Sequence, residues 1–136
     1  MSTIVPVAYL DTKSILDVIE FRLVVEPRTA GLAARRATPD NIATLEATWT
    51  GMDRNKQNPT RFAEQDLAFH LELAKITGNS LLIETLGVIR AILSQAMQTA
   101  IEHRGTVGLH YHRLMIDAIK AGDEKLTMSI MDEHLT

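Results

Sequence analysis

The sequence predicts an all-α protein, and three observations support this fold class. Hydrophobic residues make up 46% of the 136 residues, but aromatic residues only 4%. The apolar residues are mainly Leu, Ile, Ala, Val and Met, a set that suits packed helices better than sheets. Apolar positions recur at helical spacing, and no segment convincingly alternates as a strand does. We therefore expect helices around one core, which a chain of this length can bury without disulfides or a folding metal.

The start of the chain is expected to lie outside the helical domain. Residues 1–10 contain Pro6 and β-branched residues without helical periodicity, which is typical of an extended leader or the remnant of a linker. Asp11 suits the N-cap of the first helix. The predicted all-α domain therefore covers residues 11–136.

The first helix carries a charged pair on an otherwise apolar face. The residues near this stripe are Ile15, Ile19, Arg22 and Glu26. Pro27 is expected to break or kink the helix, which then resumes over residues 28–36. A buried Arg needs a partner, and its planar fork suits a carboxylate. Arg22 therefore either pairs internally with Glu26 or contacts a carboxylate ligand, and both can hold at once.

The next two helices are predicted from their end signals. Thr-Pro-Asp at residues 38–40 gives an N-cap with Pro at the first helical position, opening a helix to about Met52. Residues 53–60 form a polar loop, whose final residue, Thr60, is expected to cap the following helix. Gly78 and the Asn after it are expected to end that helix.

Three further helices are expected in the remainder of the chain. Residues 80 to about 101 are predicted to form one long helix, because their apolar residues lie near a common stripe. Residues 106–121 and 123–136 are predicted to form a final pair. Gly122 suits the position after a helix end, and Asp123 suits an N-cap. This break indicates that the two helices are antiparallel neighbours.

One Asp and three His are candidate metal ligands. Asp66 and His70 are four residues apart, so they differ by about 40° around a helix and can point at one atom. His112 and His134 lie on the final two helices. Bundles build internal metal sites from such sets, and one carboxylate with three imidazoles suits Zn²⁺, Ni²⁺ or a related ion. The alternative is that these four are ordinary capping, surface or core polar residues.

The other histidines fit an internal site less well. His110 lies about 200° around the helix from His112, so the two cannot face one site. Met115 and Ile116 follow His112 at buried helical spacing, which favours His112. His103 is expected at a solvated helix end, where a cation is favourable.

Composition and missing motifs exclude several functions. The absence of Cys rules out disulfides and thiolate ligands. With a net charge of −3 and no basic cluster beyond Arg35-Arg36, this chain alone is not expected to bind DNA.

No apolar run approaches a membrane span and no signal peptide is recognisable, so we expect a soluble cytoplasmic protein without membrane contact. No hydrolase or zinc-protease motif appears, so binding is expected rather than enzymatic turnover.

Several motifs follow one another along nearly the whole chain, from about Ile15 to Leu135. They are Arg22-Leu-Val-Val-Glu26, Leu32-Ala-Ala-Arg-Arg-Ala-Thr38, Asp66-Leu-Ala-Phe-His70, Thr77-Gly-Asn79, His112, Ala118-Ile-Lys-Ala-Gly-Asp123 and Met131-Asp-Glu-His134-Leu135. In this order they resemble the C-terminal effector-binding (FCD) domain of FadR-type GntR-family transcriptional regulators.

This resemblance implies an all-α antiparallel bundle of about six or seven helices. It also implies a homodimer with a central cavity for a small organic acid or sugar acid. In the metal-binding branch of the family, an Asp and three His hold a divalent ion at the cavity floor. Carried over by position, the metal ligands here are Asp66, His70, His112 and His134, with zinc expected first and nickel or manganese as alternatives. Arg22 becomes the contact for the effector carboxylate.

The resemblance also defines the expected function. Family regulators bind DNA through an N-terminal winged helix-turn-helix, which is absent from this chain, so DNA binding is expected only through such a missing domain. The predicted function is that of a regulatory domain that senses a small organic acid through a divalent metal. The alternatives are a metal-dependent enzyme acting on a small carboxylate and a structural dimerisation bundle.

Overall fold

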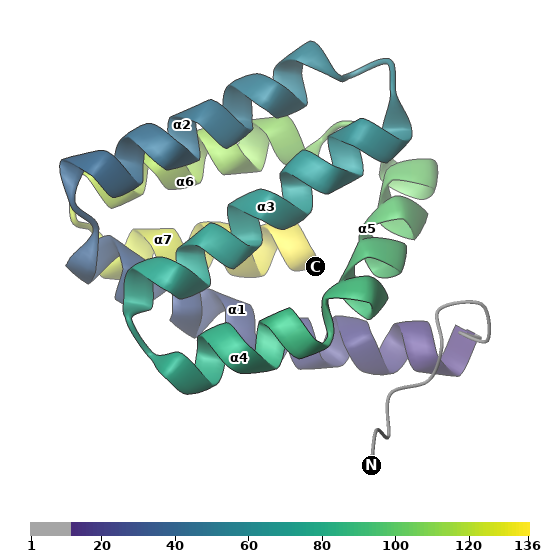
Figure 1. The fold of residues 1–136 in the computed structure, drawn as a ribbon, viewed down its shortest axis with the longest axis horizontal. Coiled ribbons are helices and arrows are strands. Elements are labelled where there is room, and N and C mark those ends of the chain that lie inside the picture. Colours follow the sequence, from purple (N-terminus) through teal and green to yellow (C-terminus); the bar gives the residue numbers. More distant parts are fainter. Residues whose placement is uncertain (1–11) are drawn as a thin grey trace.

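The computed structural model describes residues 12–136, which form seven helices (Figure 1). The helices are α1 (Thr12–Arg36), α2 (Pro39–Arg54), α3 (Pro59–Thr77), α4 (Ser80–Val88), α5 (Arg90–Arg104), α6 (Gly108–Lys120) and α7 (Glu124–Leu135). The predicted all-α class is confirmed. The leader predicted for residues 1–10 lies outside the described residues.

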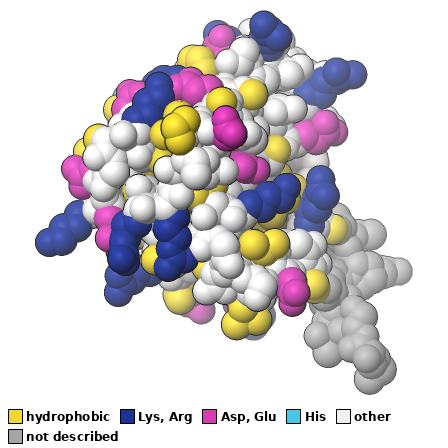
Figure 2. Space-filling view, turned by 60° about the vertical axis from the view of Figure 1, so that its left-hand side comes forward, with side chains coloured by type: hydrophobic (Ala, Val, Ile, Leu, Met, Phe, Trp, Pro, Cys, Tyr) yellow, Lys and Arg dark blue, Asp and Glu magenta, His cyan; other side chains and the backbone are white. Residues whose placement is uncertain are grey.

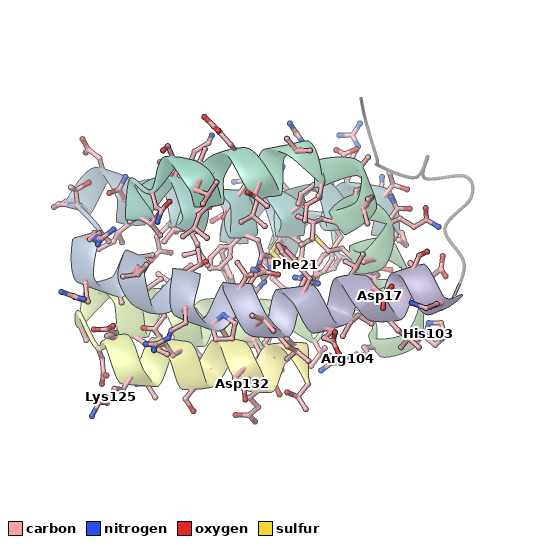
Figure 3. The ribbon with its side chains drawn as sticks, turned by 90° about the horizontal axis from the view of Figure 1, so that it is seen from below. Asp17, Phe21, His103, Arg104, Lys125 and Asp132 are labelled. Atoms are coloured by element: carbon pink, nitrogen blue, oxygen red, sulfur yellow. The ribbon has the colours of Figure 1, made fainter. Side chains whose placement is uncertain are left out.

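Helix α3 is at the centre of the packing. It contacts α1, α2, α4 and α5, and it crosses the front of the molecule in Figure 1 with α1 and α7 behind it. Helices α1 and α7 run side by side, as Figure 3 shows from below. The helix that carries Asp66 and His70 is therefore enclosed by its neighbours.

Two clusters of buried apolar residues form the core. The first includes Ala30, Ala33, Ala34, Leu45, Phe69, Leu73, Ile76, Met115, Ile116, Ala118, Ile119, Ile130 and Met131. The second includes Leu67, Ala74, Leu86, Leu93 and Met97. Helix α3 contributes residues to both clusters, from two different faces. Because successive residues are about 100° apart around a helix, the face with Asp66 and His70 lies between these two apolar faces. Apolar packing therefore flanks a polar strip in the middle of the protein.

Helix α1 continues through Pro27, so the predicted break there is wrong. Proline lacks an N–H donor, which weakens a helix locally. The helix persists because both halves are held by packing. Val18 and Phe21 lie against the second core cluster, whereas Ala30 and Ala33 belong to the first.

The structure confirms the predicted start of α2 but not the predicted start of α3. Thr38 caps α2 in a capping box with Asn41, and Pro39 is the first helical residue, as predicted. Helix α3 is capped by Asn58, whose side chain accepts from the Arg61 amide at 3.2 Å. The prediction of Thr60 as the cap is wrong. Asn58 is followed by a proline suited to the first helical position, so it outcompetes Thr60.

The predicted long helix over residues 80–101 is two helices. Helices α4 and α5 meet at Ile89 with a bend of 68°. The periodic stripe continues across the bend, because Leu86, Leu93 and Met97 all enter the second core cluster. A straight helix of this length would extend about 33 Å and carry part of the stripe past the core. The bend keeps the whole stripe buried.

The turn between α6 and α7 follows its sequence signal. Gly122 adopts a left-handed conformation with φ of 66°. The amides of Gly122 and Asp123 donate to the carbonyls of Ile119 and Ala118, which closes α6. Asp123 then caps α7 by accepting from the Leu126 amide at 3.0 Å. The predicted antiparallel pair is thus formed.

Charges and apolar groups are mixed on the surface. On the face in Figure 2, Lys and Arg side chains lie among acidic and hydrophobic ones. Among the helices of residues 12–136, none is long and apolar enough to span a membrane by itself. Only α4 and α5 taken together, across their bend, reach that length and composition.

Replacing Gly31 by Val should separate α1 from α7. A Cβ atom at Gly31 would lie 2.6 Å from the Met128 Cγ of α7, a distance that forces the helices or the side chain to shift. We expect the free energy of unfolding to fall by about 1–3 kcal/mol, as measured by urea denaturation. The matched control is Gly87→Val in α4, where a Cβ meets no atom within 4 Å. Equal losses in both variants would contradict this role of Gly31.

Replacing Glu46 by Gln should make stability less dependent on pH. Glu46 of α2 accepts from Arg113 and Lys120 of α6, and these cations lower its pKa from 4.5 to about 2. A carboxylate with a lowered folded-state pKa stabilises the protein fully above its unfolded value and loses that effect as the pH falls through about 2. We expect a difference of about 1 kcal/mol or less at pH 7. Urea denaturation curves of wild type and variant should converge between pH 4.5 and pH 2, and a constant gap would contradict this.

Candidate metal centre

The four predicted ligands come together in the interior. One donor atom each from Asp66, His70, His112 and His134 lies within 4.8 Å of the others. Asp66 and His70 come from α3, His112 from α6 and His134 from α7. All four residues are buried, with His112 fully inaccessible. The four residues that helical spacing and the α6–α7 break had selected are therefore neighbours in the structure.

The three imidazoles are packed closely around this point. The ring centroids of His70 and His112 are 5.0 Å apart, and those of His112 and His134 are 5.1 Å apart. Phe69 stacks on His112 with the centroids 4.0 Å apart. Because Phe69 is itself in the core, its ring fixes the orientation of the His112 imidazole.

Several polar atoms in this cluster have no hydrogen-bond partner. They are Asp66 Oδ1, His70 Nε2, His112 Nδ1, His112 Nε2 and His134 Nδ1. Asp66 Oδ1 lies 3.1 Å from the Nε2 atoms of both His70 and His112, but the ring nitrogens are not directed at it as hydrogen-bond donors. Buried polar atoms without partners are rare in folded proteins and often mark an ion site. The donor set, one carboxylate and three imidazoles, fits a divalent transition metal.

Glu26 is the residue of this site that the sequence did not identify. It accepts from His70 Nδ1 at 2.5 Å and also from Arg22 Nε. A carbonyl or carboxylate behind a ligating His commonly fixes its tautomer, and here it leaves Nε2 of His70 facing the cluster. The predicted Arg22–Glu26 ion pair is therefore present, and it supports His70. The sequence contained one indication of this role. Glu26 lies on the apolar stripe of the first helix, and a buried carboxylate is expected to have hydrogen-bond donors beside it.

The charges of Glu26 and His70 depend on each other. Burial disfavours the ionised form of Glu26, but Arg22 and His70 outweigh it and lower the pKa of Glu26 to about 2. Burial likewise disfavours protonated His70, but the carboxylates of Glu26 and Asp66 raise the pKa of His70 to about 9. His70 thus lies between two anions.

The other three candidate ligands have the protonation states that metal binding needs. Burial opposes ionisation of Asp66, but the adjacent imidazoles of His112 and His70 hold its pKa well below the usual range. Burial lowers the pKa of His112, and it lowers that of His134 to about 2 with help from the neighbouring imidazoles. At neutral pH these three residues therefore offer a carboxylate and two neutral imidazoles, which are the ligating forms, whereas His70 must release a proton to bind a metal.

A cavity of about 330 Å³ opens beside the cluster. Arg22, Asp66 and His134 line it together, so the guanidinium and two of the four candidate ligands face the same space. Ile15 and Ile19 of α1 form part of its apolar wall. Arg22 was predicted either to pair with Glu26 or to contact a ligand, and its position allows both.

The end of α5 lines the same cavity. Thr99, His103 and Arg104 contribute to it, and Figure 3 shows His103 and Arg104 next to the N-terminal half of α1. Arg104 Nη1 donates to the His134 carbonyl at 3.0 Å, which holds the last turn of α7 against α5. His103 is exposed at a helix end as predicted, but its place at the cavity was not foreseen. His110 is exposed and does not belong to the cluster, as expected.

Comparison with known proteins gives consistent matches. The chain is 27% identical over 126 residues to the putative L-lactate dehydrogenase operon regulatory protein of Escherichia coli, covering 88% of this chain and 48% of the relative. It is 29% identical over 121 residues to the galactonate operon transcriptional repressor of the same organism, covering 83% and 51%. The chain spans about half the length of these relatives.

A solved structure and a family model agree with these relatives. The structure of Streptococcus agalactiae GntR matches with a TM-score of 0.75 and 26% identity, over 94% of this chain and 60% of that one. The matched relatives are named as transcriptional regulators and not as enzymes. The model of the FCD domain matches residues 17–136. The predicted resemblance is therefore confirmed, and the chain belongs to the FCD domain family.

Proposed function

We propose that this domain senses a small organic acid through a divalent metal ion held by Asp66, His70, His112 and His134. The observation that carries the proposal is that Arg22 lines the same cavity as Asp66 and His134. A guanidinium beside a cluster of metal-ligand type forms a receptor for an anion, because a carboxylate can be bound by both. Zinc is the first candidate ion, with nickel and manganese as alternatives.

Each residue has a distinct part in this proposal. The metal, when bound, supplies a Lewis-acidic centre for a carboxylate or hydroxyl oxygen of the effector. Arg22 donates to the effector carboxylate from α1 while its Nε remains bonded to Glu26. Glu26 keeps the His70 ring oriented. Burial of the cluster limits access of water, which strengthens the charged interactions.

The regulatory step follows from the helices that meet at the cavity. Arg22, Asp66 and His134 come from α1, α3 and α7, so a ligand that contacts all three favours one arrangement of these helices. A ligand shifts an equilibrium only by its difference in affinity between the two states. We propose that a homodimer passes this shift to an N-terminal DNA-binding domain. In support, the two relatives are named as an operon regulatory protein and an operon transcriptional repressor.

The chemistry of the effector is suggested by the same names. The operons named for the two Escherichia coli relatives concern lactate and galactonate, which are both hydroxy acids. A hydroxy acid presents adjacent oxygens that can reach a metal together. The cavity of about 330 Å³ is at the lower end of ligand-site volumes, which favours a small acid.

Asp66→Ala and His112→Ala should each lose metal. We expect zinc affinity to fall at least about 100-fold, because even supporting residues of metal sites contribute 10–100-fold. Protein freed of metal by a chelator and titrated with zinc, with bound metal measured by mass spectrometry, tests this. The matched controls are Glu64→Ala on α3 and His110→Ala on α6, both exposed. Undiminished zinc binding in both ligand variants would remove the proposed metal site.

Arg22→Lys should weaken acid binding without loss of metal. Lysine keeps the charge but not the planar fork, so we expect lactate and galactonate to bind about tenfold more weakly to zinc-loaded protein in calorimetry. Arg28→Lys, on the exposed face of α1, should bind like wild type. Unchanged affinity for the acids in Arg22→Lys would show that Arg22 only pairs with Glu26. Conversion of a bound acid to product would contradict the sensor and favour an enzyme.

A further inference from the structure

The lining of the cavity has an imbalance of charge. Two guanidinium groups face it, Arg22 at the inner end and Arg104 near its opening, whereas Asp66 is the one carboxylate side chain among the described lining residues. Asp66 belongs to the candidate metal cluster, so it is not available to compensate Arg104. Among the lining side chains, Arg104 is therefore the one guanidinium left over when Asp66 is assigned to the metal and Arg22 to the carboxylate of a simple acid.

We infer that Arg104, together with His103, forms a second anion-binding end of the cavity, and that the preferred effector is a hydroxy acid with two carboxylates. This inference rests on the proposed function, because it extends the same cavity from the metal end to its opening. The inner carboxylate belongs to Arg22 and the metal, and the outer one to Arg104. A monocarboxylic acid fills only the inner end.

The position of Arg104 suits this role. It is the last residue of α5, and its Nη1 donates to the His134 carbonyl at 3.0 Å. That bond fixes the guanidinium beside α7, yet it uses one of five N–H donors. The remaining donors can bind a carboxylate in the two-pronged manner typical of Arg. Because Arg104 is exposed, little desolvation opposes its pairing with a ligand.

His103 adds a different kind of group to the same end. Its Nδ1 lies 2.9 Å from the Thr99 carbonyl, and a carbonyl can only accept, so Nδ1 carries the hydrogen. When the ring carries this one hydrogen, its Nε2 is a hydrogen-bond acceptor. A hydroxyl next to the outer carboxylate can donate to it. The outer end thus recognises an oxygen-rich acid and not only a charge.

The walls between the two ends suit a short carbon chain. Ile15 and Ile19 of α1 and Ala96 and Ala100 of α5 are the small and aliphatic residues of the lining from these two helices. These side chains offer no charge of their own, so the polar groups of a ligand are recognised at its ends. The volume of about 330 Å³ matches an acid of a few carbons and not a large ligand.

Matched pairs of acids test the inference on the intact zinc-loaded protein. Malate and 2-hydroxybutyrate share a four-carbon chain but differ in the second carboxylate, and galactarate and galactonate differ in the same way with six carbons. Calorimetry in about 0.15 M salt, which screens distant charges, should show the diacid of at least one pair binding about tenfold more tightly. Equal affinities within both pairs, or a preference for the monoacids, would overturn the inference.

Variants of Arg104 then test whether this residue causes the preference for diacids. Arg104→Gln should reduce the preference for the diacid to less than about twofold, whereas Arg104→Lys should retain part of this preference. The matched control is Arg90→Gln, which removes the same charge from the other end of α5 and should keep the full preference. A preference that survives in Arg104→Gln would overturn the assignment. The comparison in wild type stands even if a variant loses the bond to His134.

The same experiment separates this inference from the proposed function. If monoacids and diacids bind equally and only in the presence of zinc, the second anion site fails while the metal-dependent sensor stands. If all the acids bind equally with and without zinc, or none binds to zinc-loaded protein, both fail.

Discussion

The compensation of buried charge is the constraint on which the rest of the structure depends. Glu26 and Asp66 are carboxylates in a helical interior, where an unpaired charge is strongly destabilising. Arg22 stands beside Glu26, and His70 stands between Glu26 and Asp66, so cationic and anionic groups alternate from α1 into α3. Asp66 ends this series among ring nitrogens that do not donate to it, which is why a divalent ion fits there.

Apolar packing makes such a polar centre possible. The two core clusters lie on either side of the polar face of α3 and hold the surrounding helices in place. Phe69 shows the connection most directly, because its ring belongs to the core and also stacks on His112. Burial then sets the ionisation of the centre by lowering the pKa of His112 and His134. The core therefore determines both the geometry and the charge of the site.

Much of this arrangement could be predicted from the sequence, and the exceptions have physical reasons. Asp66 and His70 were found because their relation depends only on helical periodicity. The bond between Glu26 and His70 joins α1 to α3, and periodicity carries no information on which helices touch. The bend at Ile89 was missed because the same apolar stripe serves a straight helix and a bent pair. Arg104 was missed because an exposed cation has no distinguishing sequence pattern.

The centre draws on both the first and the last helix, α1 and α7, with α3 and α6 between them. Contacts so distant along the chain require closure of the longest loops, whose entropy must be offset before the contacts form. During synthesis, the cluster cannot be complete until α7 has emerged and docked against α1. A partly made chain therefore lacks the proposed receptor, and under the proposed function ligand binding reports a fully folded domain as well as the presence of an acid.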